Sequence, residues 1–308
     1  MARMGLVGVG LMGQGIGENL LKKGHELTVV AHRNRGPVDA LVAMGARETA
    51  TPRAVAEASE VIIVCVTASP QFRSIAEGEN GLMAAMGLGK TIVDCTTGEP
   101  GVVLDYAMRV AAAGGHFADA PLARTPVEAR EGRLNTMVGA TPEVFAEIRP
   151  ILDCFCENIF HIGGPGSGAK LKLIYNLLTM GQAALTAEAV SACRATGIDL
   201  AKFYEVVSKG GGNSGIFQMI MTGFLQSGSL DGLKFSIANA EKDLRYYNRM
   251  TGEFGLAAPM GPAVHNQLMA ARKLGFEDGL VGHLVAAALK FNGLDDTTDV
   301  IPAKAGTQ

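Results

Sequence analysis

The chain has 308 residues, 27 basic and 30 acidic side chains, and a formal net charge of −3. Only 19% of the residues are charged and there is no basic excess, which argues against a protein that binds nucleic acid or an anionic membrane. Hydrophobic residues make up 48% of the chain and the 40 glycines show no fixed period, which excludes disordered and collagen-like chains. The length predicts about two domains.

The start of the chain and its cysteines bear on location. The apolar stretch 1–17 is broken by five glycines from Gly5 to Gly15 and runs into Glu18, so we expect no signal peptide. No other stretch of 18 apolar residues occurs, so we expect no membrane span. Five cysteines, without the spacing of a metal site, are typical of a reducing compartment. We therefore expect a soluble, cytoplasmic protein that holds no metal.

Residues 1–163 alternate short apolar runs with helical segments. Continuous apolar runs predict strands that are buried on both faces, at residues 4–9, 27–31, 61–66, 91–94, 116–119, 135–138 and 158–162. Between them, helices are predicted at residues 14–23, 52–58, 101–113 and 142–153, the last with Thr141 as its N-cap and Pro142 in its first turn. This alternation predicts an α/β domain, a Rossmann-type doubly wound sheet over residues 1–163.

Strand signals stop after residue 163. A helical pattern runs from the glycine-rich turn 163–168 to about residue 195, followed by helical stretches near 199–208, 214–227, 235–254, 260–274 and 279–292. We therefore expect an all-α domain over residues 164–308, whose long first helix connects it to the sheet domain. Residues 295–308 show no periodicity and are expected to fray.

A G-x-G-x-x-G motif follows the first predicted strand and begins the first helix: Gly8-Val9-Gly10-Leu11-Met12-Gly13. In that context the glycines allow a tight turn, a close approach of a pyrophosphate and close helix–strand packing, while the helix N-terminus attracts the phosphates. The motif predicts a dinucleotide site that includes Leu11 and Met12. The alternative is a glycine-rich turn without a ligand.

The second predicted strand is followed by Arg33, Asn34 and Arg35, where NAD enzymes carry a carboxylate for the ribose 2′-hydroxyl. Arginines bind phosphate through forked, charge-assisted hydrogen bonds. We therefore expect NADP(H) as the preferred cofactor, bound by these three residues, with NAD(H) as an alternative. The arginines are otherwise solvated loop charges.

Four blocks in order resemble the β-hydroxyacid dehydrogenase family, the group of 3-hydroxyisobutyrate dehydrogenase and tartronate semialdehyde reductase. The blocks are the loop 8–13; Asp119-Ala120-Pro121 continuing to Gly132 and Gly139; Gly166-x-Gly168-x-x-x-Lys172-x-x-x-Asn176; and Lys242-Asp243-Leu244. The resemblance spans nearly the whole chain. It implies an oxidoreductase that uses a nicotinamide cofactor and acts on a small anionic hydroxyacid or semialdehyde.

The third block carries the expected catalytic residues. Lys172 and Asn176 are four residues apart and share a helix face, which Tyr175, Thr179 and Thr186 extend as a polar stripe. The resemblance implies that Lys172 is the general acid or base and that Asn176 orients the reacting oxygen. A lysine needs its pKa of about 10.4 lowered by burial or a nearby cation for this task.

Lys242, in the fourth block, is implied to lie beside the cofactor, and it is also a candidate for the cation near Lys172. The alternatives are a surface position for Lys172 and a solvated helix charge for Lys242.

The second block departs from the family pattern. Where the family has Ser-Gly-Gly, this chain has Ala123-Arg124-Thr125, and the resemblance implies that these residues contact the substrate. An arginine binds a carboxylate, sulfonate or phosphonate through two hydrogen bonds. Arg124 also resembles the arginine of the family's sulfolactaldehyde reductases. The alternative is a structural ion pair of Arg124 with Glu128 or Glu131.

Three smaller sites complete the expectations. The resemblance implies that Thr97, near the end of a strand, lies close to the nicotinamide, although a strand-capping role is an alternative. The pair Val66-Thr67 stands where the family has a Leu-Pro or Met-Pro pair over the same ring. Asn213-Ser214 belongs either to a substrate loop or to a plain connector between helices.

The sequence thus predicts an NADP(H)-dependent oxidoreductase that interconverts a hydroxyl and a carbonyl group. One alternative is an imine reductase of the same architecture, although those proteins usually lack the lysine that stands here at position 172. The other is a catalytically silent NADP-binding protein. The apolar C-terminal part, with few charges from Leu280 to Leu289, predicts a homodimer or homotetramer.

Overall fold

The structure, a computed structural model, describes residues 2–294, so the tail expected to fray lies outside the described residues. The chain divides into two compact units, Met1–Lys172 and Leu173–Gln308, each described here by itself. The domain boundary expected after residue 163 stays a prediction. No helix among the described residues is both long and apolar enough to cross a membrane.

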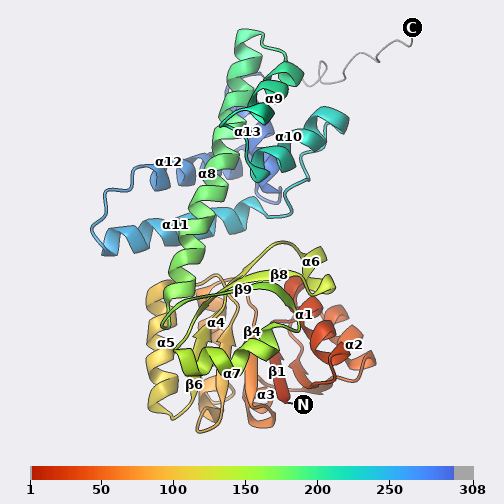
Figure 1. The fold of residues 1–308 in the computed structure, drawn as a ribbon, viewed down its shortest axis with the longest axis vertical. Helices are drawn as coiled ribbons and strands as arrows, with labels where there is room; N and C mark the ends of the chain where they lie inside the picture. Colours follow the sequence, from red (N-terminus) through yellow and green to blue (C-terminus); the bar gives the residue numbers. More distant parts are fainter. Residues whose placement is uncertain (1, 295–308) are drawn as a thin grey trace. The chain divides into compact units, whose positions relative to one another are not determined.

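The first unit is built on a nine-stranded sheet with the order β3-β2-β1-β4-β5-β6-β8-β7, and β9 pairs with β8 (Figure 1). Pairing is parallel except where β8 meets β6 and β7. The strands are β1 (Arg3–Val7), β2 (Glu26–Val30), β3 (Arg47–Thr49), β4 (Val61–Val64), β5 (Thr91–Asp94), β6 (His116–Asp119), β7 (Leu122–Ala123), β8 (Leu134–Gly139) and β9 (Cys156–Gly163). The order from β3 to β6 is that of the doubly wound Rossmann fold.

Helices cover both faces of this sheet. They are α1 (Leu11–Lys22), α2 (Gly36–Ala43), α3 (Pro52–Ala58), α4 (Ser69–Ala76), the short 3₁₀ turn η1 (Leu82–Ala85), α5 (Pro100–Ala112), α6 (Pro126–Glu131) and α7 (Pro142–Leu152). Side chains alternate along each strand, so Leu6 packs in the core with α1, α2 and α7, whereas Val7 packs in the core with α3, α4 and α5. This burial on both faces explains the continuous apolar runs.

Each of the seven expected strands and four expected helices of this unit occurs, with ends that differ by a few residues. Thr141 caps α7 as predicted, its hydroxyl accepting a hydrogen bond from the Val144 N–H at 3.4 Å. Five elements were not predicted from the sequence: β3, β7, α2, α4 and α6. These elements are short, and the residues of β3 are mostly exposed, so neither length nor hydrophobic period marks them.

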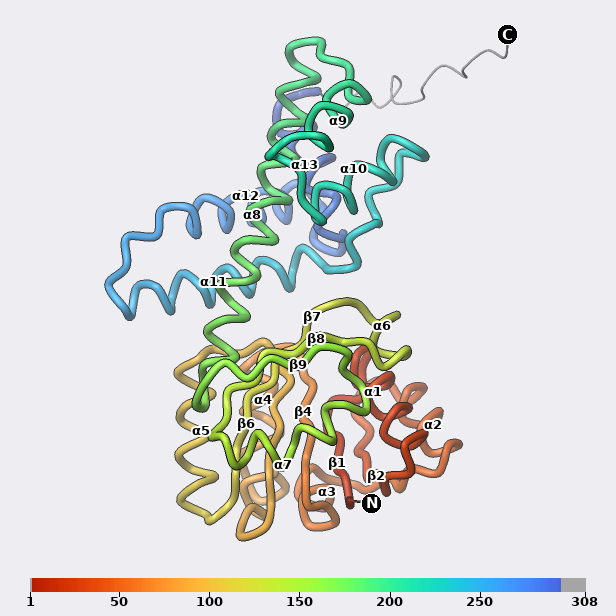
Figure 2. The backbone as a smooth tube through the Cα atoms, in the orientation of Figure 1, coloured from red at the N-terminus to blue at the C-terminus, as the bar shows by residue number. Residues whose placement is uncertain are grey.

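The second unit is all-helical. Its helices are the continuation of α8 (Ser167–Thr196), then α9 (Leu200–Lys209), α10 (Gly215–Ser227), α11 (Ile237–Glu253), α12 (Met260–Ala271), a π-helical turn η2 (Arg272–Phe276), η3 (Val281–His283) and α13 (Leu284–Phe291). One apolar core joins them, with Leu244 and Leu268 fully buried. Figure 2 shows the chain leaving β9 and entering α8, which starts in the first unit and continues in the second.

Candidate active site

The glycine motif forms a tight loop between β1 and α1. Gly8 has a φ of +98°, and a Cβ there would lie 2.3 Å from the Cys65 carbonyl oxygen. A Cβ at Gly13 would lie 2.2 Å from the Gly8 carbonyl oxygen, so both positions require glycine for the loop to close. A Cβ at Gly10 would meet nothing within 4 Å, which leaves the outer side of the loop open.

No side chain caps the first turn of α1, which begins at Leu11, a largely exposed residue, and continues with the half-buried Met12. The backbone N–H groups of a helix's first turn have no acceptor within their own helix. Together with the open face at Gly10, they form a cradle that fits the phosphates of a dinucleotide.

The loop between β2 and α2 carries the arginines expected to bind a 2′-phosphate. Arg35 is already paired, with Glu48 at 2.9 Å and Asp39 at 3.1 Å. Arg33 is exposed and forms no ion pair with another of the described residues. The Asn34 side chain accepts a hydrogen bond from the Gly36 N–H at 3.2 Å. No sequence pattern points to the partner from β3, because Glu48 lies 13 residues beyond Arg35.

The segments after β4 and β5 meet at the same edge of the sheet as the glycine loop, because β1, β4 and β5 are parallel neighbours. The Val66 N–H donates a hydrogen bond to the Thr96 hydroxyl at 3.3 Å, which ties the two segments together. Thr67 is exposed and Thr97 is half-buried. The fold thus brings all three residues predicted for the nicotinamide, Val66, Thr67 and Thr97, to this edge.

Two buried carboxyl groups stand opposite each other where β5 and β6 end, at Asp94 and Asp119. Burial raises the pKa of Asp94 to about 7, although a hydrogen bond from the Thr96 N–H at 2.9 Å favours the carboxylate. Burial also raises the pKa of Asp119 to about 6, against hydrogen bonds from the Gly166 and Ala169 N–H groups.

Asp119 caps helix α8 from a distance of nearly 50 residues in the sequence. Its Oδ1 accepts a hydrogen bond from the Gly166 N–H at 2.6 Å, and its Oδ2 accepts one from the Ala169 N–H at 2.7 Å. A Cβ at Gly139 would lie 2.4 Å from Asp119 Oδ1, and one at Gly168 would lie 2.9 Å from Oδ2. Asp119, Gly139 and Gly166-x-Gly168, which lie apart in the sequence, therefore meet at one place in the fold.

Arg124 lies between β7 and α6 in a left-handed conformation, with a φ of 81°, a region that favours glycine. Its Nη1 donates hydrogen bonds to the Arg133 carbonyl oxygen and to the carboxylate of Glu157 on β9. The structural ion pair considered from the sequence involved Glu128 or Glu131; the partner in the structure is Glu157 instead.

The neighbours of Arg124 have structural roles. Ala123 is buried in β7. Thr125 is the N-cap of α6, where its hydroxyl accepts a hydrogen bond from the Val127 N–H and donates one to Glu128 at 2.5 Å. The Thr125 hydroxyl is thus already engaged, so of the three predicted substrate contacts Arg124 has the side chain best suited to bind an anion.

Helix α8 carries the expected catalytic pair. Lys172 and Asn176 are both buried and stand one turn apart. The Asn176 amide donates a hydrogen bond to Asp243 at 2.6 Å, and the Lys242 ammonium lies 3.0 Å from the other oxygen of Asp243. Asp243, only 1% exposed, therefore joins two predicted site residues of the second unit.

Two hydroxyl groups of the polar stripe expected along α8 form hydrogen bonds within the helix. The hydroxyl of Thr179 donates to the Tyr175 carbonyl oxygen, and that of Thr186 to the Gln182 carbonyl oxygen, so each is bonded within its own helix. In the loop before α10, Ser214 caps the helix and the Asn213 side chain bonds to the Ser208 carbonyl oxygen. These bonds tie the loop to the helices on either side of it.

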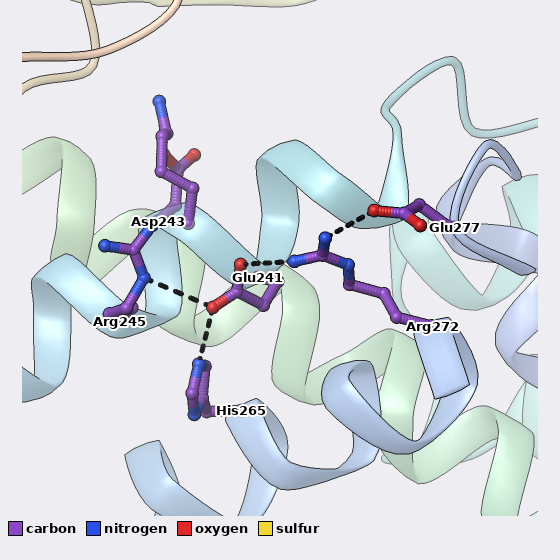
Figure 3. Close-up of polar contacts among 7 residues, drawn as sticks. Glu241, Asp243, Arg245, His265, Arg272 and Glu277 are labelled. Carbon is purple, nitrogen blue, oxygen red and sulfur yellow. Dashed lines mark hydrogen bonds and ion pairs between the residues drawn. The ribbon is translucent and has the colours of Figure 1, made fainter. Parts of the chain in front are cut away.

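Glu241 precedes Lys242 and is the centre of a group of charges, the Glu241 cluster, formed by Glu241, Arg245, His265, Arg272 and Glu277 (Figure 3). His265 lies 2.8 Å and Arg272 3.0 Å from its carboxylate. Burial alone would raise the pKa of Glu241, but His265 and Arg245 hold it below its usual value. The cluster fixes α11 to α12 and η2 at the residue next to Lys242 and Asp243.

Asp119, Glu157 and Asp243 were not assigned a role from the sequence. Asp119 and Asp243 each belong to a recognised block, and the blocks were the one signal that pointed to them. Glu157 lies in a strand with no motif, and its contact with Arg124 spans 33 residues. Only the folded chain reveals that contact.

Two family models match the chain. Residues 3–163 match the NAD binding domain of 6-phosphogluconate dehydrogenase, and residues 166–284 match the model described as NAD-binding of NADP-dependent 3-hydroxyisobutyrate dehydrogenase. The first match alone covers more than half of the chain.

Individual relatives are similar over long stretches. The chain is 37% identical over 190 residues to 2-hydroxy-3-oxopropionate reductase of Escherichia coli K12, covering 61% of this chain and 63% of that protein. It is 30% identical over 275 residues to 3-sulfolactaldehyde reductase of the same organism, covering 89% and 92%. A solved structure described as Psf3 in complex with NADP+ and 2-OPP is 25% identical, with a TM-score of 0.79, covering 92% of this chain and 99% of that one.

Proposed function

The chain belongs to the β-hydroxyacid dehydrogenase family, and on that premise we propose that it is an NADP(H)-dependent reductase that interconverts a semialdehyde and a hydroxyacid carrying an anionic head. The observation that carries the proposal is the buried Lys172 on α8, the helix that Asp119 anchors where β6 ends. A buried lysine at a motif position is suited to proton transfer, whereas an exposed one is not.

The chemistry divides between the cofactor and the chain. The nicotinamide, when bound, supplies the hydride in reduction or accepts it in oxidation. In reduction, the Lys172 ammonium donates a proton to the carbonyl oxygen; in oxidation, the neutral Lys172 amine accepts the hydroxyl proton. Asn176 holds the same oxygen by a hydrogen bond, and its own amide is oriented by Asp243. Arg124 binds the anionic head and thereby fixes the distance to the reacting carbon.

The cofactor part of the proposal rests on two residues and on the relatives. Gly10 leaves space for the pyrophosphate, and Arg33 offers an exposed guanidinium where the 2′-phosphate lies in Rossmann enzymes. The family model matched by the second unit is named for an NADP-dependent enzyme, and the related solved structure holds NADP+. We propose NADP(H) as the preferred cofactor, with NAD(H) accepted more weakly.

Two further features of the proposal concern the whole protein. Ile174, Leu178 and Leu185 form an exposed apolar stripe on one side of α8, which supports association into a homodimer or homotetramer. Sedimentation equilibrium of wild type and Leu178→Asp measures this association, and a monomeric wild type contradicts it.

The free cysteines support a reducing compartment, the cytoplasm.

The test compares two lysines of the same helix. NADPH and NADH oxidation are measured with small semialdehydes that carry carboxylate or sulfonate heads, on wild type, Lys172→Ala and Lys170→Ala. Lys170 provides the matched control because it lies about 200° around the helix from Lys172. We expect Lys172→Ala to lose about 10²–10⁴-fold in kcat while it binds NADPH within threefold of wild type. A Lys172→Ala protein with wild-type kcat, or a wild type that binds no NADP(H), contradicts the proposal.

A further inference from the structure

Helix α8 begins against a buried carboxylate that belongs to another element. Asp119, at the end of β6, is 1% exposed, and each of its oxygens accepts one backbone N–H from the start of the helix. With both oxygens held in this way, the carboxylate does not face a substrate. Both of these hydrogen bonds come from the start of the helix.

Backbone on two sides confines the Asp119 carboxylate to one position. Gly139 on β8 and Gly168 on α8 enclose it from two sides, and a methyl group on either would lie within 3 Å of a carboxylate oxygen. A Cβ at Gly168 would also lie 2.2 Å from the Met137 carbonyl oxygen, so the helix touches β8 backbone here. The start of α8 is therefore fixed against two strands at once.

The fixed turn leads directly to Lys172. Ala169, whose N–H bonds to Asp119, is buried in the core with α3, α4 and α5, which holds the helix against rotation about its axis. Lys172 follows three residues later, on the same side of the helix and about 4.5 Å along it. A single helical turn is too short to absorb a displacement at its start, so a shift of the cap becomes a shift of the lysine.

We propose that Asp119 is a positioning residue for the reaction: its carboxylate sets the place of the Lys172 amine through the first turn of α8. The inference rests on the proposed function, because it assigns Asp119 a role through the residue that transfers the proton. A misplacement of about 1 Å of a reacting group can cost on the order of 10²-fold in rate. An asparagine at position 119 keeps one acceptor oxygen but leaves one of the two N–H groups facing an NH₂ group.

The experiment is a double-mutant cycle on the full chain with its cofactor. Asp119→Asn, Lys172→Ala and the double variant are compared with wild type for kcat, KM and the dissociation constant of NADPH. Tyr106→Phe is the matched control, because Tyr106 is buried in the same core as Ala169 and donates a hydrogen bond to the carboxylate of Glu77 at 2.5 Å, away from α8. It removes a comparable bond without touching the cap.

We expect Asp119→Asn to lower kcat by about 10–10²-fold, with KM and NADPH binding within threefold of wild type, and to add less than a threefold loss once Lys172 is absent. Tyr106→Phe should leave kcat within twofold in both backgrounds. An equal loss in both backgrounds means that the effect is structural and overturns the inference, as does an unchanged kcat.

The variants distinguish a failure to fold, a failure of the proposed function and a failure of the positioning role alone. If Asp119→Asn does not fold, the cycle is run with Asp119→Glu, which keeps the charge and both acceptors but lengthens the side chain by one methylene, with the same expectations. If Lys172→Ala itself keeps its kcat, the proposed function fails at its own residue and the inference falls with it. If only the coupling is missing, the proposed function stands and the positioning role alone is refuted.

Discussion

The guanidinium of Arg124 is held by the carboxylate of Glu157, although the two residues are 33 positions apart. Only Nη1 takes part, and it also donates to the Arg133 carbonyl oxygen. The Nε and Nη2 groups have no partner among the described residues, and they form the edge with which arginine binds a carboxylate or sulfonate in two hydrogen bonds. Glu157 thus orients the cation without using that edge.

Arg124→Gly should raise KM for anionic substrates about tenfold or more and leave neutral analogues unaffected, because charge-assisted hydrogen bonds are lost. Its free energy of unfolding should change by no more than about 1 kcal/mol, because glycine relieves a left-handed residue while an exposed ion pair is lost. Steady-state kinetics and urea unfolding measure both. An equal response of anionic and neutral substrates would refute the anion-binding role.

The variant Glu157→Gln tests whether Glu157 orients the Arg124 guanidinium for the substrate or competes with the substrate for it. If Glu157 orients Arg124, the variant raises KM for anionic substrates several-fold at unchanged kcat. A lower KM would mean that Glu157 competes with the substrate for the guanidinium. Glu131→Gln is the matched control, because Glu131 pairs with Arg133 rather than with Arg124.

Two substitutions in the glycine loop should have different effects, one on NADPH binding and the other on stability. Gly10→Ala places its methyl group in open space and should unfold like wild type, but bind NADPH at least tenfold more weakly, because the methyl group occupies the phosphate side of the loop. Gly13→Ala places its methyl group 2.2 Å from the Gly8 carbonyl oxygen and should lower the unfolding free energy by about 1–3 kcal/mol. Gly101→Ala, also in open space but in α5, is the control for both.

For Gly10→Ala and Gly13→Ala, calorimetric titration with NADPH and urea unfolding provide the two measurements. Tight NADPH binding by a folded Gly10→Ala protein would show that the pyrophosphate does not approach at that position.

The two arginines after β2 should differ in their effect on cofactor choice. Arg33→Ser should raise KM for NADPH about tenfold while KM for NADH stays the same, because an arginine–phosphate contact is lost. Arg35→Ser should have a smaller effect, since Asp39 and Glu48 already share its charge. The ratio of kcat/KM for the two cofactors measures the preference. A ratio that neither substitution changes would contradict the proposed NADP(H) preference.

Asp94 should make stability depend on pH. Its pKa is raised from 3.8 to about 7 by burial, so the folded state binds a proton at Asp94 more tightly than the unfolded chain does. The stability that this proton binding provides is complete below about pH 4 and is lost as the pH rises through 7. Between pH 4 and 8, wild type should therefore lose unfolding free energy relative to Asp94→Asn, by on the order of 2 kcal/mol or more, since one pKa unit corresponds to about 1.4 kcal/mol. Asparagine keeps an acceptor for the Thr96 N–H.

Urea unfolding of both proteins at several pH values measures the difference between wild type and Asp94→Asn, which includes the effect of the Asp94 charge on the neighbouring Asp119. Parallel pH curves would show that Asp94 does not titrate in this range.

The sequence predicted the doubly wound sheet and the helical second part because continuous apolar runs and long helical periods are local signals. Short elements such as β3, with three residues, and α6, with six, lack such signals, since each spans fewer than two hydrophobic periods. Thr141 could be predicted as a cap because its partner Val144 is three residues away. Asp119 caps a helix far along the chain, and no local pattern encodes that contact.

The ion pairs of the arginines likewise depend on contacts between distant residues, which no local pattern predicts. The arginines at 33, 35 and 124 were recognisable as candidate anion-binding residues, but their state depends on carboxylates from other strands. Glu48 neutralises Arg35, and Glu157 orients Arg124. From the sequence, Arg33 and Arg35 had the same predicted role at the cofactor and Arg124 a role at the substrate. In the structure, Arg35 and Arg124 form ion pairs, whereas Arg33 forms none with another of the described residues.

The cap of α8 has a consequence for dividing the protein. A fragment that stops at residue 163 retains Asp119 but loses both N–H donors, Gly166 and Ala169, together with the apolar side chain of Ala169. It would also lose Gly168, which packs against the Asp119 carboxylate, so the end of β6 would lose both the hydrogen bonds and the cover that α8 provides. A sheet domain that folds alone must therefore carry the first turns of α8, so the lysine at position 172 travels with the nucleotide half of the molecule.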